Sequence, residues 1–164
     1  MADASAYFRR LFEHEQVAHG LLLAALEAVP AERRIAPPFQ QAVDLLAHLA
    51  GARRMWLARL GFAPAPAGGF DPKGTELAAL PGLLSEMHAL WTRYLAGLTD
   101  ADVERPFEYQ SSDAGRFRNT LGEVLTQLHG HSCHHRGQIA LHLRGLGQKP
   151  PITDFIFWAR VPVP

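Results

Sequence analysis

The chain has 164 residues, 48% of them apolar and 20% charged, which is ordinary for one globular domain with a sizeable core, so we expect a single domain over residues 1–164. Formal net charge at pH 7 is zero, no Lys/Arg run stands out and no apolar run approaches the roughly 20 residues of a membrane span, so we expect neither a nucleic-acid nor a membrane partner. The N-terminus has no apolar signal-peptide core, and the single cysteine, Cys133, excludes an internal disulfide, which fits a cytoplasmic protein.

The first predicted helix covers about Ala4 to Val29 and ends before Pro30. Apolar residues recur along it at helical spacing: Phe8, Leu11, Phe12, Ala18, Leu22 and Leu26. Glu15 and His19 interrupt this stripe in the middle of the helix. Two interpretations stay open: both side chains face the bundle interior, or the stripe drifts and leaves them at its edge.

The second predicted helix runs from about Phe39 to Leu60, with Pro38 suited to a first helical position and Gly61 to the position after the end. Its apolar face contains Ala42, Leu45, Leu46, Leu49, Ala52, Met55 and Trp56. His48 lies beside this face at mid-helix. A lone histidine there is usually a packing residue, so its importance depends on what the rest of the chain supplies.

A loop rich in Pro, Gly and Ala follows over residues 62–74, and a third helix is expected from Thr75, or from just after Pro81, to about Leu98. His88, at the edge of that helix, is predicted to be a surface or packing residue. In the next segment, PFEYQ and RFR flank SSDAG, whose Asp-Ala-Gly turn signal predicts a small β-hairpin.

The fourth long helix is predicted to open with a capping box formed by Thr120 and Glu123, and to run to about Arg144, where Gly145 or Gly147 ends it. Four long amphipathic helices indicate an all-α four-helix bundle with a small β-hairpin before the last of them. The tail carries an apolar cluster, and its prolines argue against a long helix. We expect this cluster to pack on the bundle or on a neighbouring subunit: Ile152, Phe155, Ile156, Phe157 and Trp158.

The fourth helix holds five of the nine histidines. Its inward stripe is predicted to read Leu121, Val124, Leu128, His131, His135, Gln138 and His142. His131 and His135, at positions i and i+4, can direct two imidazole nitrogens at one ion, with His48 as a third ligand. Three imidazoles with an open fourth position are typical of a catalytic site, although an accidental pair is common in a histidine-rich helix. Cys133 points to the other side of the helix and is excluded as a ligand.

Three segments resemble the DinB family, which includes the YfiT-like metal-dependent hydrolases. HSCHHRGQI at residues 131–139 matches the H-x-x-x-H-R-G-Q-I signature, residues 45–60 match the second helix of the family, and TDFIFWAR at residues 153–160 is similar to its C-terminal ending. The resemblance implies His48, His131 and His135 as metal ligands. It also implies an up-up-down-down bundle with a long crossover, and frequently a homodimer.

This chain departs from the resemblance in its first helix. Family members often have Tyr-Asn and Asn around the positions of His14, Glu15 and His19. The sequence assigns no role to His14, His19, His129, His134 or His142.

The leading interpretation of function is a metal-dependent enzyme acting on a small molecule, of the thiol-dependent transferase or hydrolase type. Characterised relatives include transferases and isomerases that use low-molecular-weight bacterial thiols. Zinc is the expected metal, with nickel or iron as alternatives, because imidazole suits all three. Glu15 is the candidate general base, and Gln138 and His142 are weaker candidates for a pocket role.

Two other interpretations remain. One is a non-catalytic metal-binding or stress-related protein on the same scaffold. The other is a structural bundle whose histidines are only satisfied core residues.

Overall fold

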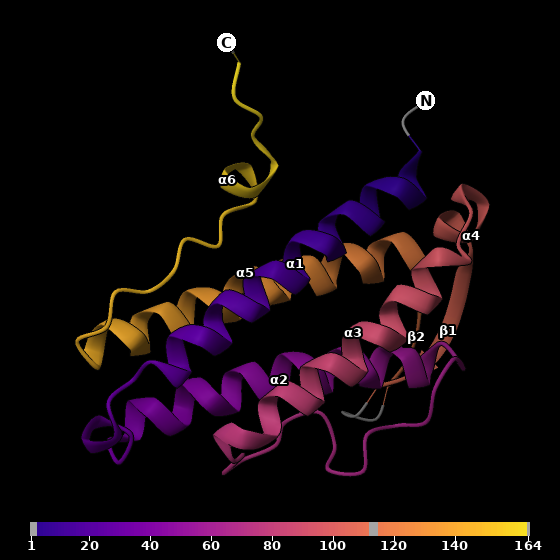
Figure 1. Cartoon of the computed structure of the whole chain (residues 1–164). Helices are drawn as coiled ribbons and strands as arrows, with labels where there is room; N and C mark the ends of the chain where they lie inside the picture. Colours follow the sequence, from indigo (N-terminus) through magenta and orange to yellow (C-terminus); the bar gives the residue numbers. More distant parts are fainter. Residues whose placement is uncertain (1–2, 112–114, 164) are drawn as a thin grey trace.

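The computed structural model describes residues 3–111 and 115–163. Four long helices form the bundle (Figure 1): α1 Ala4–Glu27, α2 Pro37–Arg59, α3 Leu80–Ala96 and α5 Leu121–Gly145. The other elements are η1 Ala31–Arg33, η2 Leu77–Ala79, α4 Asp100–Glu104, β1 Pro106–Gln110, β2 Arg116–Thr120 and α6 Phe155–Ala159. The predicted all-α bundle with a hairpin before the last long helix is confirmed.

Local sequence signals set several helix ends. The Thr120 hydroxyl accepts a hydrogen bond from the Glu123 backbone N–H, and the Glu123 carboxylate accepts one from the Thr120 N–H, so the predicted capping box is present. Gly61 and Gly147 both have φ of 71° and directly follow the C-caps of α2 and α5. This left-handed conformation favours glycine, so Gly147 is the glycine that follows the C-cap of α5, whereas Gly145 is the last residue of the helix itself.

The strands β1 and β2 pair antiparallel, with Tyr109 opposite Phe117. Arg116 and Arg118 both bind the Glu108 carboxylate, at 2.8 and 2.6 Å. The predicted Asp-Ala-Gly turn lies largely outside the described residues, which resume at Gly115. The Tyr109 ring lies 4.9 Å from the Trp56 ring, so the hairpin covers the C-terminal end of α2.

The helices do not run in the predicted up-up-down-down directions, so that prediction is wrong. The short connection over residues 28–36 makes α1 and α2 antiparallel, whereas the long loop over residues 61–76 returns along the bundle, so α2 and α3 run the same way (Figure 1). Gln40 near the start of α2 bonds the Thr75 carbonyl before α3, and the Trp91 indole N–H donates to the Arg53 carbonyl further along both helices. Helix α5 then lies antiparallel to α2, which brings His131 to His48.

The buried stripe of α5 also differs from the prediction. After Leu128 it continues through Ser132, Arg136, Ile139 and Leu143, all buried. Leu121, Val124 and Leu128 are buried as predicted, but the later members of the predicted stripe, including His131 and His135, are half-buried on the adjoining face. The histidines therefore lie at the edge of the core, where a ligand can reach them.

Helix α6 places the tail partly on the bundle. The rings of Phe155 and Trp158 lie 5.3 and 5.6 Å from the His14 ring of α1. Phe155 and Trp158 are half-buried, whereas Ile152, Ile156 and Phe157 are exposed, so packing on the bundle is confirmed for only two residues of the cluster and full burial for none. In the described part of the chain, no helix combines the length and apolarity needed to cross a membrane.

Candidate metal centre

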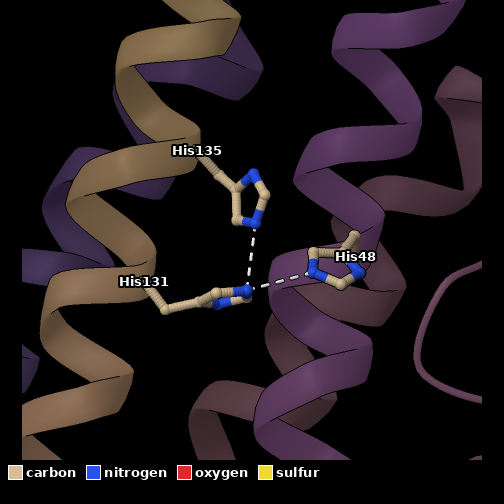
Figure 2. A group of neighbouring side chains, drawn as sticks. All are labelled: His48, His131 and His135. Atoms are coloured by element: carbon tan, nitrogen blue, oxygen red, sulfur yellow. Dashed lines mark hydrogen bonds between the residues drawn. The ribbon is translucent and has the colours of Figure 1, made fainter.

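The side chains of His48, His131 and His135 converge between α2 and α5 (Figure 2). His131 Nε2 lies 3.2 Å from His48 Nε2 and 2.9 Å from His135 Nε2. Each of the three residues offers one nitrogen, and these nitrogens lie within 4.8 Å of one another. The structure thus brings together the three residues that the sequence singled out as ligands.

Burial keeps His48 and His131 in the form that binds metal. Removal from water, followed by the neighbouring His135 and His48, lowers the pKa of His131 to about 4. The pKa of His48 is lowered by burial and then by His135. Only a neutral imidazole has a nitrogen lone pair to donate, so both rings are available as ligands at neutral pH.

The outer nitrogens of two of these rings face polar partners. His135 Nδ1 lies 2.6 Å from the Gln138 side-chain oxygen, so the Nδ1–H donates there and Nε2 carries the lone pair. The Asp71 carboxylate lies 3.4 Å from His48 Nδ1, although without hydrogen-bond alignment. Such outer partners orient metal-binding histidines and set their tautomers.

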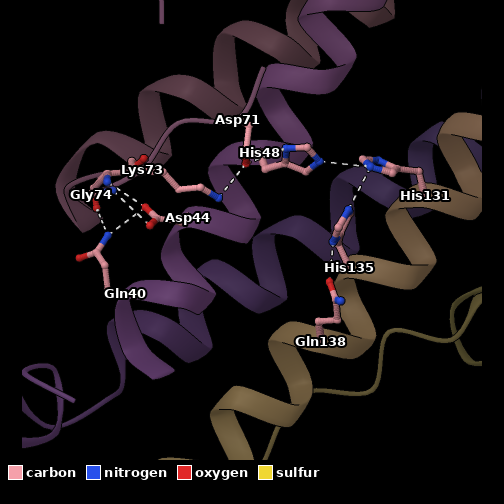
Figure 3. A network of polar contacts seen from close by, with 10 residues as sticks. Gln40, Asp44, His48, Asp71, Lys73, Gly74, His131, His135 and Gln138 are labelled. Carbon is pink, nitrogen blue, oxygen red and sulfur yellow. Dashed lines mark hydrogen bonds and ion pairs between the residues drawn. The ribbon is translucent and has the colours of Figure 1, made fainter. Parts of the chain in front are cut away.

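A loop segment brings Asp71 to the site (Figure 3). The Asp44 carboxylate of α2 accepts hydrogen bonds from the Gly74 and Thr75 backbone N–H groups, at 3.1 and 2.9 Å. At Gly51, a Cβ atom would lie only 2.9 Å from the Phe70 carbonyl oxygen. The loop can therefore lie against α2 only because position 51 has no side chain.

The donor set fits a divalent ion. Nitrogens at about 2.0–2.1 Å from a tetrahedral zinc ion are about 3.3 Å apart, close to the 3.2 and 2.9 Å found here. Within residues 3–111 and 115–163, no cysteine, carboxylate or further histidine joins this group. Three protein ligands leave a coordination position for an exogenous molecule.

A cavity of about 200 Å³ opens beside His48 and His131. Its lining combines aromatic and apolar side chains with several polar ones. The other described lining residues are Ala52, Met55, Trp56, Arg59, Phe70, Ser111, Gln127 and Leu128. The arrangement can hold a small molecule against the three histidines.

Glu15 faces the interior, which settles the open question about the first helix, but its contacts are with arginine. Arg53 donates from Nε to one carboxylate oxygen at 2.7 Å and from Nη2 to the other. Burial alone would raise the pKa of Glu15, but Arg53 and His19 bring it below its usual value. Glu15 does not line the cavity beside the histidines. Its catalytic role stays a prediction.

The remaining histidines do not join the three-histidine group, although the His134 ring lies 5.0 Å from the His135 ring. His19 is buried and stacks on His88, which is a packing residue as predicted. His14 bonds the Thr153 carbonyl, at 3.0 Å. His134 is exposed, and His142 lines a separate groove with Gln138.

Sequence reasoning missed the buried cations. Arg53 and Arg136 are only 5% exposed. Arg53 had a detectable signal, because it continues the helical repeat of Leu46, Ala50 and Leu57. Phe70 and Asp71 had none, since their position depends on the path of a long loop.

The DinB family model matches residues 1–161 of the chain. Searches of curated proteins and of solved structures gave no match. The match covers almost the whole chain, and the three histidines of the family signature and of the second helix lie together in the structure. The chain belongs to the DinB family.

Proposed function

We propose that this protein is a metal-dependent enzyme whose ion is held by His48, His131 and His135, with zinc as the metal and nickel or iron as alternatives. The observation that carries the proposal is the convergence of three imidazole nitrogens beside a cavity, without a fourth protein ligand in the described residues. A bound ion of this kind supplies a Lewis acid that favours the deprotonated form of a water or thiol at its open position.

The chain's own residues hold and orient the reactants. The three histidines fix the position of the ion, and Gln138 fixes the tautomer of His135. Trp56 and Phe70 wall the cavity and exclude water from one side of a bound molecule. The described part of this lining has no carboxylate. This favours a reaction in which a low-molecular-weight thiol is the nucleophile over a hydrolysis that needs a protein base.

A non-catalytic metal-binding role is the second candidate. It is favoured by the engagement of Glu15 with Arg53, which leaves the predicted general base paired and away from the cavity. Both candidates share the metal centre, so activity must separate them.

The experiment is a panel of thiol-transfer and hydrolase assays on protein loaded with zinc, nickel or iron and on chelated protein. Turnover with one thiol and one metal, lost on chelation and restored by that metal, is the expected result. A protein that binds one ion per chain tightly and is inactive across the panel would favour the non-catalytic role.

A further inference from the structure

A row of side chains on α2 forms the floor of the cavity. His48, Ala52, Met55, Trp56 and Arg59 all line it. Spacings of four, seven, eight and eleven residues return to one face of a helix. Arg59 lies about three turns, or roughly 16 Å along the helix axis, beyond His48. The cavity therefore has the metal-binding residues at one end and an arginine toward the other.

Contacts with aromatic rings hold the Arg59 head group in place. Its Cζ lies 4.7 Å from the centre of the Trp56 ring and 5.4 Å from that of Tyr109. Helical side chains lean toward the N-terminus, so Arg59 reaches back over Trp56 toward His48. A guanidinium packed against rings keeps its N–H donors in its own plane, where they can bind a carboxylate in a bidentate manner.

The two preceding arginines of α2 are used differently. Arg53 is paired with the buried Glu15, and Arg54 binds the Glu86 carboxylate at 3.1 Å. The charge of Arg59 is instead presented beside a lining that, as far as it is described, contains no carboxylate. The three histidines at the other end carry no negative charge that would offset it. The cavity therefore favours an anion.

We propose that Arg59 is the specificity residue of the cavity and binds a carboxylate of the substrate. The substrate class is a small molecule with a metal-binding atom at one end, an apolar or aromatic body that packs on Met55, Trp56 and Phe70, and a carboxylate at the other end. This inference rests on the proposed function, because it takes the ion to be held by the three histidines.

The test uses the full chain loaded with zinc and two matched probes. One is 3-[4-(mercaptomethyl)phenyl]propanoic acid, and the other is its primary amide, which has the same shape and no charge. Isothermal titration calorimetry measures both dissociation constants for the wild type, Arg59→Gln, Arg59→Lys and Arg54→Gln. Zinc content and thermal melting are recorded for every variant.

The acid should bind the wild type more tightly than the amide does. Arg59→Gln should weaken acid binding about 10- to 100-fold, the loss expected for a charge-assisted hydrogen bond, and should change amide binding less than about twofold. Arg59→Lys should weaken acid binding less than Arg59→Gln does, because lysine keeps the charge but not the planar pair of donors. Arg54→Gln, the matched control, should keep the wild-type ratio.

Equal losses for acid and amide in Arg59→Gln would overturn the inference and show that Arg59 only packs on Trp56. Equal binding of the two probes to the zinc-loaded wild type would overturn it as well. A wild-type protein that takes up none of zinc, nickel and iron would refute the proposed function itself, and this result is read from the metal content alone. The two failures are thus distinguishable.

Discussion

Glu15 and Arg53 form an ion pair that is almost entirely removed from solvent, with side-chain exposures of 1% and 6%. Removing one partner leaves the other charge buried and unpaired. We expect Glu15→Gln to lower the free energy of unfolding by about 3–5 kcal/mol, measured by denaturant titration. Replacing both partners, in Glu15→Leu with Arg53→Met, should recover most of that loss.

The exposed pair of Arg54 and Glu86 provides the control. Glu86 has a side-chain exposure of 54%, so Glu86→Gln should cost less than about 1 kcal/mol. If Glu15→Gln lowers the free energy of unfolding by an equally small amount, the charges of Glu15 and Arg53 are solvated and the account of a buried pair is wrong.

His19 provides a dependence of stability on pH. Burial lowers its pKa to about 3, so the 3.6 Å contact of its Nε2 with Glu15 is not an ion pair at neutral pH. Below about pH 6.5, His19 is protonated in the unfolded chain but stays neutral in the folded chain. The free energy of unfolding therefore falls as the pH falls below about 6.5. His19→Phe should reduce the slope of unfolding free energy between pH 5 and 6.5 by up to about 1.4 kcal/mol per pH unit.

Chelated samples of both proteins keep the metal ligands from contributing to the difference, and unfolding is followed by circular dichroism. Identical slopes in the two proteins would mean that His19 is protonated equally in the folded and unfolded states.

At the scale of elements, the approach of the loop to α2 depends on Gly51. A methyl group there would meet the Phe70 backbone, with its nearest atom at 2.9 Å. We expect Gly51→Ala to displace the loop and carry Asp71 away from His48. The affinity for zinc should fall by about 10- to 100-fold, the usual effect of losing an outer partner of a metal ligand.

Gly20→Ala serves as the control, because nothing lies within 4 Å of a Cβ atom at that helical position. Calorimetric titration of zinc into each variant measures the effect. Unchanged zinc affinity in Gly51→Ala would show that the loop does not support the site.

Elements with a local signal were predictable, and those fixed by tertiary contacts were not. Thr120 with Glu123 and Gly61 define helix ends by short-range hydrogen bonding or backbone conformation, so the sequence located them. The spacing of His131 and His135 likewise placed both on one side of α5. The directions of the helices were predicted wrongly because they depend on the path of the loop over residues 61–76. The path of a loop leaves no periodic pattern in the sequence. The buried stripe through Ser132 and Arg136 was missed because polar residues there resemble an exposed face.

At the scale of the whole molecule, exposed apolar side chains lie along α1 and the tail. Val17 and Leu21 are 46% and 42% exposed, and they line one groove with Phe157. An apolar surface of this kind supports the proposal of a homodimer. Light scattering coupled to size-exclusion chromatography should give twice the mass of the 18.1 kDa chain, and Phe157→Glu with Leu21→Glu should give the monomer mass.

Tyr7→Glu, at another exposed position of α1 that does not line this groove, is the control and should leave the mass unchanged. A monomeric wild type at the concentrations tested would contradict the proposal.

The central claim is that His48, His131 and His135 together hold one divalent ion. The most direct measurement is the metal content of dialysed protein for the wild type, for His131→Ala combined with His135→Ala, and for His134→Ala, which alters an exposed histidine of the same helix. The wild type and His134→Ala should retain about one ion per chain, and the double variant almost none, because a single imidazole cannot hold the ion. Full retention of the metal by the double variant would contradict the claim.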